Sequence, residues 1–329
     1  MAVKPDKKDL QILFELDRDC RQSFNEIAHK TRLSRDVVRY RISRLETEGY
    51  VTGYISIIDF TRLGFHIVRL YLKLQNTTEK IEDEMIKYLM QQEAVIVAYR
   101  TDGNFEIALG LLVKDLRHYQ EVYENLLGKY RSYIVEKNFS VFQDYIQYFR
   151  NYLVEDKSWD YKELSTGSHQ QFQYDKTDIL LLKEIATSAR ASLVDLAKKL
   201  KMPVTTVKYR LRNLEKNGVI VAYRAIINYT KLGYEYYKVD LVIEDLSIIP
   251  SLQEFIRRHP NIIYRDITIG GSDFEFDCEL PNQQEFYKLI ETIRNMYPKK
   301  IRSYFYYKAI YIYKYSYFPN LLLKEVNVK

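Results

Sequence analysis

The sequence contains the same segment twice, and this duplication limits the architectures that the chain can adopt. The stretch LSRDVVRYRISRLETEGYV at residues 33–51 recurs as MPVTTVKYRLRNLEKNGVI at residues 202–220. Asp9 and Asp178 match at the same spacing of 169 residues, and a later Phe-Glu pair keeps that spacing. A repeat of this length is long enough for one or more domains, so we expect two homologous halves.

Each half opens with three short helical patterns. Asp6 and Asp175 precede apolar residues at helical spacing, and Ser23 with Glu26 forms a capping box for a second helix. Ser34 is placed to cap a third helix, and a glycine follows its last turn in both copies. The buried face of this third helix is predicted at Val38, Ile42 and Leu45. Three short helices with these caps predict a helix-turn-helix.

After the helices, the apolar period changes from 3.6 to 2, which is typical of strands. Helical patterns return at about 79–91 and 114–127 in the first half, and at about 249–258 and 282–296 in the second. The resulting order, βαββαβ, predicts a ferredoxin-like sheet with its helices on one face. Aromatic residues are expected along one side of the last strand: Phe305, Tyr307, Tyr311, Tyr313 and Tyr315. We therefore expect another layer to cover the second face of the sheet.

The predicted fold class is α+β, as a tandem duplication of a winged helix-turn-helix and a ferredoxin-like βαββαβ domain. The expected domains are a helix-turn-helix at 1–54, a βαββαβ domain at 60–149, a linker at 150–174, a second helix-turn-helix at 175–224 and a second βαββαβ domain at 229–318. The stretch STGSHQQ at 165–171 is typical of a polar linker.

The positive charge of the chain is concentrated in the helix-turn-helix segments. Residues 175–224 contain eleven Lys and Arg against five Asp and Glu, and residues 1–54 contain eleven against nine. The whole chain has a net charge of +6, so the remainder is slightly acidic. Basic domains on a neutral body favour a polyanionic partner such as duplex DNA.

Other compositional features exclude several classes of protein. No stretch of about 20 apolar residues is present to span a membrane, so we expect a cytoplasmic, nucleoid-associated protein without a membrane partner. Cys20 and Cys278 are the only thiols, and the five histidines are scattered singly. We therefore expect no disulfide, metal site, cofactor or catalytic residue.

The segments VRYRISRLETEGYVTGY and VKYRLRNLEKNGVIVAY, with Leu63-Gly64 and Leu232-Gly233 after them, resemble the Lrp/AsnC family of transcription regulators. The resemblance extends over residues 6–147 and 175–317. It implies βαββαβ domains of the ligand-binding (RAM) type that pair face to face, often within larger discs. Here it implies that the two halves of one chain pair as an intrachain pseudo-dimer, and that further assembly uses the same domains.

The third helix of each half is the candidate DNA-binding element. If the apolar residues point inward, helical geometry turns a second set outward, where Arg and Lys can contact guanine or phosphate and Tyr can contact phosphate. The candidate residues are Arg35, Asp36, Arg39, Tyr40, Ser43, Arg44, Thr205, Lys208, Tyr209 and Arg212. Arg41 and Arg210 lie beside the apolar stripe. The sequence does not distinguish between a structural salt bridge and a phosphate contact for these two side chains. The outward residues differ between the halves, which predicts two non-identical half-sites.

A second candidate site is the turn between the middle strands of each βαββαβ domain. Its residues are Asp102, Gly103 and Asn104 in the first half, and Gly271, Ser272 and Asp273 in the second. The family resemblance places a small amino-acid-like effector near this turn, where backbone N–H groups suit a carboxylate. The family has an acid directly after the glycine, whereas this chain has Asn104 and Ser272. A plain hairpin turn is the competing interpretation.

Two other functions remain open from the sequence. Siroheme decarboxylases resemble the same family and also occur as fused chains, but they have a His-Asn-Tyr type segment before the middle turn. This chain has Val-Ala-Tyr-Arg at 97–100 and Ile-Ile-Tyr-Arg at 262–265, so it lacks that histidine. An architectural DNA-binding protein would use the same basic domains, and only its many genomic sites would distinguish it from a regulator.

Overall fold

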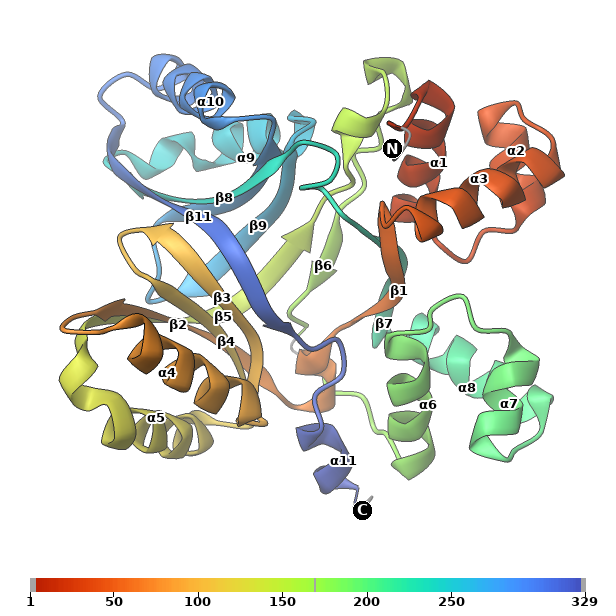
Figure 1. The fold of residues 1–329 in the computed structure, drawn as a ribbon, viewed down its shortest axis with the longest axis horizontal. Coiled ribbons are helices and arrows are strands. Elements are labelled where there is room, and N and C mark those ends of the chain that lie inside the picture. Colours follow the sequence, from red (N-terminus) through yellow and green to blue (C-terminus); the bar gives the residue numbers. More distant parts are fainter. Residues whose placement is uncertain (1–3, 169, 327–329) are drawn as a thin grey trace.

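Each half of the chain folds into a helix-turn-helix domain, a ribbon strand and a four-stranded sheet with two helices (Figure 1). The computed structural model describes residues 4–168 and 170–326. In Figure 1 the two helix-turn-helix domains lie on one side of the molecule, and the sheets form a barrel on the other. This arrangement confirms the predicted tandem α+β fold.

The first helix-turn-helix consists of α1 (Lys7–Arg18), α2 (Phe24–Thr31) and α3 (Arg35–Thr47). Asp6 and Ser23 each form a capping box at the start of α1 and α2. Each box satisfies backbone N–H groups that have no partner within the helix. The predicted caps of this domain are therefore confirmed.

The second helix-turn-helix consists of α6 (Lys176–Ala186), α7 (Leu193–Leu200) and α8 (Val204–Lys216). Asp175 and Ser192 cap α6 and α7 through their side chains. Pro203 precedes α8 and supplies no side-chain hydrogen bond, whereas Ser34 accepts one from Val37 before α3. The two third helices thus begin differently.

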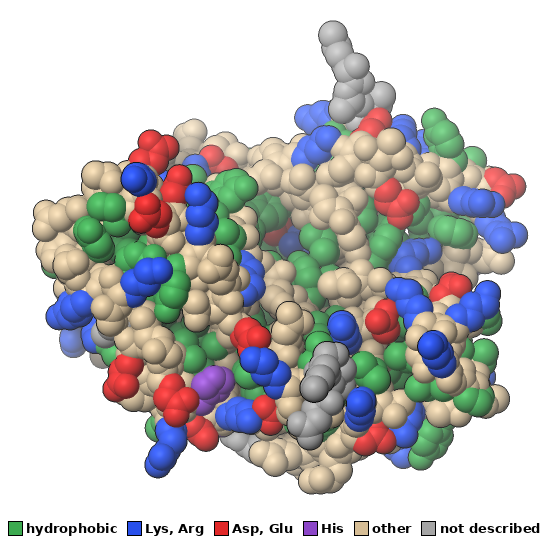
Figure 2. Space-filling view, turned by 60° about the horizontal axis from the view of Figure 1, so that its bottom comes forward, with side chains coloured by type: hydrophobic (Ala, Val, Ile, Leu, Met, Phe, Trp, Pro, Cys, Tyr) green, Lys and Arg blue, Asp and Glu red, His purple; other side chains and the backbone are tan. Residues whose placement is uncertain are grey.

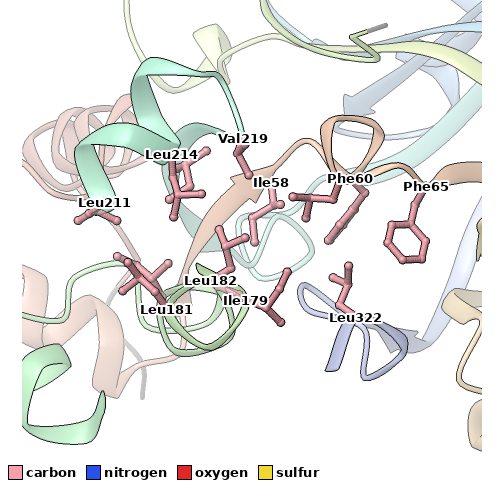
Figure 3. Packing of buried hydrophobic residues seen from close by; sticks show 14 of the residues in the cluster. Ile58, Phe60, Phe65, Ile179, Leu181, Leu182, Leu211, Leu214, Val219 and Leu322 are labelled. Carbon is pink, nitrogen blue, oxygen red and sulfur yellow. The ribbon is translucent and has the colours of Figure 1, made fainter. Parts of the chain in front are cut away.

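A two-stranded ribbon connects the two helix-turn-helix domains. β1 (Val51–Ile58) pairs antiparallel with β7 (Ile220–Ile227). The helices pack on the ribbon strand of the opposite half, α1 against β7 and α6 against β1. Figure 3 shows one such core, in which Ile58 and Phe60 of the first half meet Ile179 and Leu182 of α6. The halves are therefore interlocked and do not form separate units.

The two sheets follow the predicted βαββαβ order. The first half contains β2 (His66–Leu74), α4 (Glu79–Gln91), β3 (Val95–Gly103), β4 (Ile107–Val113), α5 (Leu116–Tyr130) and β5 (Ile134–Gln147). The second contains β8 (Glu235–Ile243), α9 (Ile249–Arg258), β9 (Ile262–Ile269), β10 (Phe274–Leu280), α10 (Gln283–Met296) and β11 (Ile301–Tyr315). Apolar cores lie between each sheet and its helices.

The sheets join edge to edge and close into a barrel of eight strands. Their order is β2-β4-β3-β11-β8-β10-β9-β5, and β5 pairs again with β2. The contacts between the halves are the antiparallel pairs β3 with β11 and β5 with β9. The sequence predicted only that two faces would cover one another. Hydrogen bonding of all four sheet edges also removes the exposed edges that open sheets leave.

The predicted aromatic side of the last strand is wrong for part of β11. Register shifts occur between Ala309 and Tyr311 and between Ile312 and Lys314. Each shift moves the following residues to the other face of the strand. Tyr307 consequently lies buried inside the barrel, whereas Tyr311 is 60% exposed.

The linker is more ordered than its polar composition predicted. Residues 164–166 form β6 (Leu164–Thr166), which pairs with β5, and 3-10 turns occupy Asn151–Leu153 and Asp156–Ser158. His169 of the predicted linker lies outside the described residues. After β11, the short α11 (Leu321–Glu325) packs on the core around α6 (Figure 3). Among the described residues, no helix has the length and apolarity needed to cross a membrane.

Candidate nucleic-acid interface and central cavity

The third helix of the first half presents its predicted candidate residues to solvent. Val38, Ile42 and Leu45 are buried in the domain core. The opposite side of α3 is exposed at Arg35, Asp36, Arg39, Tyr40 and Ser43. Tyr40 is 67% exposed, although a tyrosine in a globular domain usually packs its ring. An exposed aromatic ring between cations suits a groove of duplex DNA.

The third helix of the second half has the same arrangement with different chemistry. Val207, Leu211 and Leu214 are buried, so the packing of the helix is retained. Thr205, Lys208, Tyr209 and Arg212 are exposed on α8. Tyr209 is 71% exposed and occupies the same position as Tyr40. The packing has been kept while the outward residues have diverged.

Three arginines near these faces form internal ion pairs. Arg41 contacts Asp6 at 2.7 Å and Asp9 at 2.9 Å, and Arg210 contacts Asp175 and Asp178 at 2.9 Å each. These carboxylates begin α1 and α6, so the structure places the two arginines in fold-stabilising roles. The candidate residue Arg44 also contacts Asp9, at 2.5 Å, and is only partly exposed. Of the candidates on α3, Arg35 and Arg39 remain the exposed cations.

The repeated L-E-x-x-G segment has a structural explanation. Glu46 at the end of α3 accepts a hydrogen bond of 2.5 Å from the hydroxyl of Tyr54 on β1. Glu215 accepts one of 2.6 Å from Tyr223 on β7 in the same way. Each bond joins a third helix to its ribbon strand, so the ribbon fixes the orientation of both candidate DNA-binding helices.

The surface around the helix-turn-helix domains is rich in cations. Figure 2 shows Lys and Arg side chains over the side of the molecule that contains these domains, at the right of the view, and also over the barrel at the left. Acidic side chains lie among them in smaller groups. The residues counted from the sequence give both domains a net positive charge, which would attract a polyanion.

The candidate effector turns make mostly internal contacts. Asp102, Gly103 and Asn104 are exposed, and a side chain at Gly103 would lie 2.5 Å from the carbonyl oxygen of Tyr306. The glycine therefore permits β11 to approach β3. In the second turn, Ser272 donates its N–H to Glu275 at 2.9 Å, and Asp273 accepts one from Ile243 at 2.7 Å. The effector sites at residues 102–104 and 271–273 both stay predictions.

The barrel encloses a cavity of about 290 Å³ that the sequence did not predict. Its end is covered by the ribbon, where Ile55, Ile57, Ala225 and Ile227 line it. Its polar and aromatic lining includes Arg69, Tyr99, Tyr145, Arg150, Arg224, Tyr236, Lys238, Tyr264, Asp266, Asp277, Glu279 and Tyr315. Cavities of this size in proteins commonly hold small molecules.

A buried charge cluster forms one wall of the cavity. Arg69 contacts Asp266 at 2.9 Å and Glu275 at 2.5 Å. Lys238 contacts the same two carboxylates at 2.8 and 3.0 Å. Burial alone would raise the pKa of Glu275, but Lys238 and Arg69 outweigh it and lower that pKa to about 2. The cluster therefore holds charged groups inside the barrel.

This cluster had a sequence signal. The strand Phe-Glu-Phe-Asp-Cys-Glu-Leu at 274–280 alternates apolar and acidic residues, and every one of its residues is buried. Alternation usually predicts a polar face in water. When a covering layer is also expected, as it was here, the same alternation instead predicts charges in an interior. Cations at matching strand positions, Arg69 and Lys238, would have identified their partners.

A second buried cluster joins α1 to the far half of the barrel. Arg150 pairs with Asp17 at 2.8 Å and with Glu279 at 2.9 Å, and Arg224 donates to both oxygens of Asp17 at 2.7 and 2.8 Å. Asp17 has no exposed surface, and its pKa is lowered because Arg224 and Arg150 outweigh the effect of burial. The second half has Ala186 at the position of Asp17, so only the first helix-turn-helix is held in this way.

Known proteins are similar to this chain in sequence and in structure. A family model described as winged helix-turn-helix DNA-binding matches residues 5–52 and 174–221. The HTH-type transcriptional regulator Ptr1 of Methanocaldococcus jannaschii is 32% identical over 111 residues, which cover 34% of this chain and 74% of that protein. LrpA of Pyrococcus horikoshii is 31% identical over 124 residues, 38% of this chain and 86% of that protein. The chain belongs to the Lrp/AsnC family.

The whole fold is also similar to the fold of a solved protein. The siroheme decarboxylase NirDL superposes with a TM-score of 0.62 over 98% of both chains, at 15% identity. The Lrp/AsnC regulators above match about a third of this chain, whereas this similarity includes both halves. At 15% identity the similarity concerns the fold alone: two winged helix-turn-helix regions and one barrel made by two βαββαβ domains.

Proposed function

We propose that this chain is a sequence-specific regulator that binds duplex DNA through α3 and α8 as an intrachain pseudo-dimer. The supporting observation is the pair of exposed third helices that keep the same buried residues and present different outward residues. Arg39 is exposed on α3, and Lys208 is exposed at the equivalent position of α8. Both can reach phosphates or base edges without disturbing the core. The β1–β7 ribbon joins the two domains that contain these helices.

The two half-sites of the target DNA should differ. A homodimer has identical recognition helices, so its symmetry requires symmetric half-sites. Here Thr205 stands in the position of Asp36, so a hydroxyl replaces a carboxylate that can accept a hydrogen bond from a base. Arg212 stands in the position of Ser43 and adds a cation. Each changed base contact contributes about 1 to 3 kcal/mol of discrimination. The fusion of two halves therefore permits an asymmetric operator.

Selection from random duplex DNA with the intact chain tests this proposal. We expect an enriched site with two unequal halves. In a variant whose residues 34–44 are replaced by the sequence of residues 203–213, the enriched site should become symmetric. Circular dichroism and thermal melting of that variant verify its fold. No enriched site, or a symmetric site for the unaltered chain, would contradict the proposal, and genome-wide occupancy at many unrelated sites would favour an architectural role.

A second candidate function comes from the fold shared with NirDL. One structure of that protein contains an iron-uroporphyrin III analogue, whose acidic side chains require cationic partners. In the present cavity, Arg69, Arg150, Arg224 and Lys238 each contact a buried carboxylate, and none of the described lining residues is a histidine. We therefore place decarboxylation second. Mass spectrometry of siroheme incubated with the protein should detect no loss of carbon dioxide, and a loss would favour the enzyme.

A further inference from the structure

The two walls of the central cavity have different chemistry. The second half contributes Asp240, Asp266 and Asp277 to the buried cluster on β8, β9 and β10. The equivalent positions of the first half are Tyr71, Thr101 and Ala108. Ile67, Val97 and Leu109 of β2, β3 and β4 line the cavity beside them. The wall from the second half is thus acidic, whereas the first half has no acid at these three positions, although both come from one duplicated sequence.

The acidic wall contains more carboxylates than cations. Asp240, Asp266, Glu275 and Asp277 surround Arg69 and Lys238, which leaves an excess of two acids. The Oδ1 atoms of Asp266 and Asp277 have no hydrogen-bond donor among the described residues. The contact from Lys238 to Asp277 is 3.4 Å, too long for a strong charge-assisted bond. The other oxygen of each carboxylate accepts a hydrogen bond, but a buried oxygen without a donor is costly, so this wall favours an additional cation.

Aromatic rings lie around the carboxylates of the acidic wall. Tyr99, Tyr236 and Tyr315 line the same cavity, and Tyr145 stacks on Tyr264 with ring centroids 4.9 Å apart. Burial raises the pKa of each of these hydroxyls, so all five tyrosines are neutral at pH 7. The faces of neutral aromatic rings attract organic cations, and several rings around one site form the aromatic cages that bind ammonium groups.

We propose that the barrel cavity binds a small organic ammonium ion with an apolar body. Its ammonium group would contact Asp266 and Asp277 among the tyrosines, and its body would lie against Ile67 and Val97. A ligand carboxylate would find Arg69 and Lys238 already paired with acids. The cavity therefore favours a cation over an anion or a zwitterion, and this site is separate from the turns at residues 102–104 and 271–273.

The ligand would also contact the ribbon that orients both candidate DNA-binding helices. Ile57 of β1 and Ile226 of β7 line the cavity, and the same strands hold the tyrosines that bind Glu46 and Glu215. A ligand that fills the cavity would therefore favour one ribbon position. This coupling rests on the proposed function, whereas binding of the ammonium ion does not.

Binding should strengthen with increasing pH. Burial raises the pKa of Asp277 to about 7, and the negative charge of Asp266 acts in the same direction. The positive charges of Lys238 and Arg69 act to lower this pKa, as does the hydrogen bond that Tyr236 donates to the Asp277 carboxylate. A bound cation favours the ionised carboxylate, so the proton must leave when the ligand binds. The ionised fraction rises about tenfold from pH 6 to pH 8, and affinity should rise by a similar factor.

Isothermal titration calorimetry without DNA tests the site. The probes are butylammonium and phenethylammonium, with 2-phenylethanol and 3-phenylpropionate as a neutral and an anionic control of similar shape. We expect saturable heat from an ammonium probe alone, and affinity reduced at least tenfold in Asp277→Asn. Tyr264→Phe should keep binding because it keeps the ring face, whereas Tyr264→Leu should weaken it. Glu291→Gln, on the exposed side of α10, is the matched control and should bind normally.

Two results would overturn the proposal. One is the absence of saturable heat for both ammonium probes, and the other is equal binding by the neutral control or by folded Asp277→Asn. Circular dichroism verifies the fold of each variant. A DNA titration with and without phenethylammonium then measures the coupling. Failure of DNA binding alone would contradict the proposed function and leave the calorimetric result intact.

Discussion

Replacing Arg39 and Lys208 together by glutamate should weaken DNA binding by roughly 10² to 10⁴-fold at moderate salt, because each helix loses a cation that contacts a base or phosphate. Both side chains are exposed, and both lie opposite the buried stripes of α3 and α8. The fold should therefore be retained. Fluorescence anisotropy with a selected duplex at several salt concentrations measures the affinity and its salt dependence.

The salt dependence provides a second measure of the same prediction. Each phosphate contact contributes about 0.9 to the slope of log affinity against log salt, so the double variant should have a slope smaller by about 2 if both cations contact phosphate. Lys80→Glu with Lys87→Glu, on the exposed side of α4, makes the same change in net charge away from these helices. Equal loss of affinity in this control would show that total charge, and not α3 and α8, determines binding.

The helix-turn-helix domains were predictable because their signals are local. Each short helix has apolar residues at helical spacing, a glycine follows each third helix, and Asp6, Ser23 and Ser34 cap as expected. The outward set on α3 and α8 followed from the same periodicity. The partners of Arg41 and Arg44 were not predictable, since they depend on how closely α1 crosses α3.

The barrel was only partly predictable because its closure depends on contacts distant in sequence. Strand alternation predicted two-sided sheets, but it could not specify that β3 pairs with β11 and β5 with β9. The register shifts in β11 leave no signal in a run of alternating aromatic residues, so Tyr311 was assigned to the wrong face. The cavity follows from that closure, and for this reason it was absent from the sequence-based site.

Replacing Asp17 by asparagine should lower the free energy of unfolding by roughly 3 to 5 kcal/mol, because Arg224 would lose its buried carboxylate and Arg150 would keep only Glu279. Asp17 accepts hydrogen bonds from both guanidinium groups and has no exposed surface. Chemical denaturation at pH 7 measures the effect. Limited proteolysis should also cleave the first helix-turn-helix before the second, since Asp17 holds only α1 against the barrel.

The pH dependence of stability tests the cause of this effect. Because the pKa of Asp17 is lowered in the folded protein, its contribution is present above the unfolded pKa of about 3.9 and is lost as pH falls through the folded value. The difference between wild type and Asp17→Asn should therefore shrink below about pH 4. Asp83→Asn, exposed on α4, is the matched control and should change stability by less than about 0.5 kcal/mol. If Asp17→Asn destabilises the protein no more than this control, the ion cluster does not hold α1 on the barrel, and shape complementarity around Leu13 and Leu16 must hold it instead.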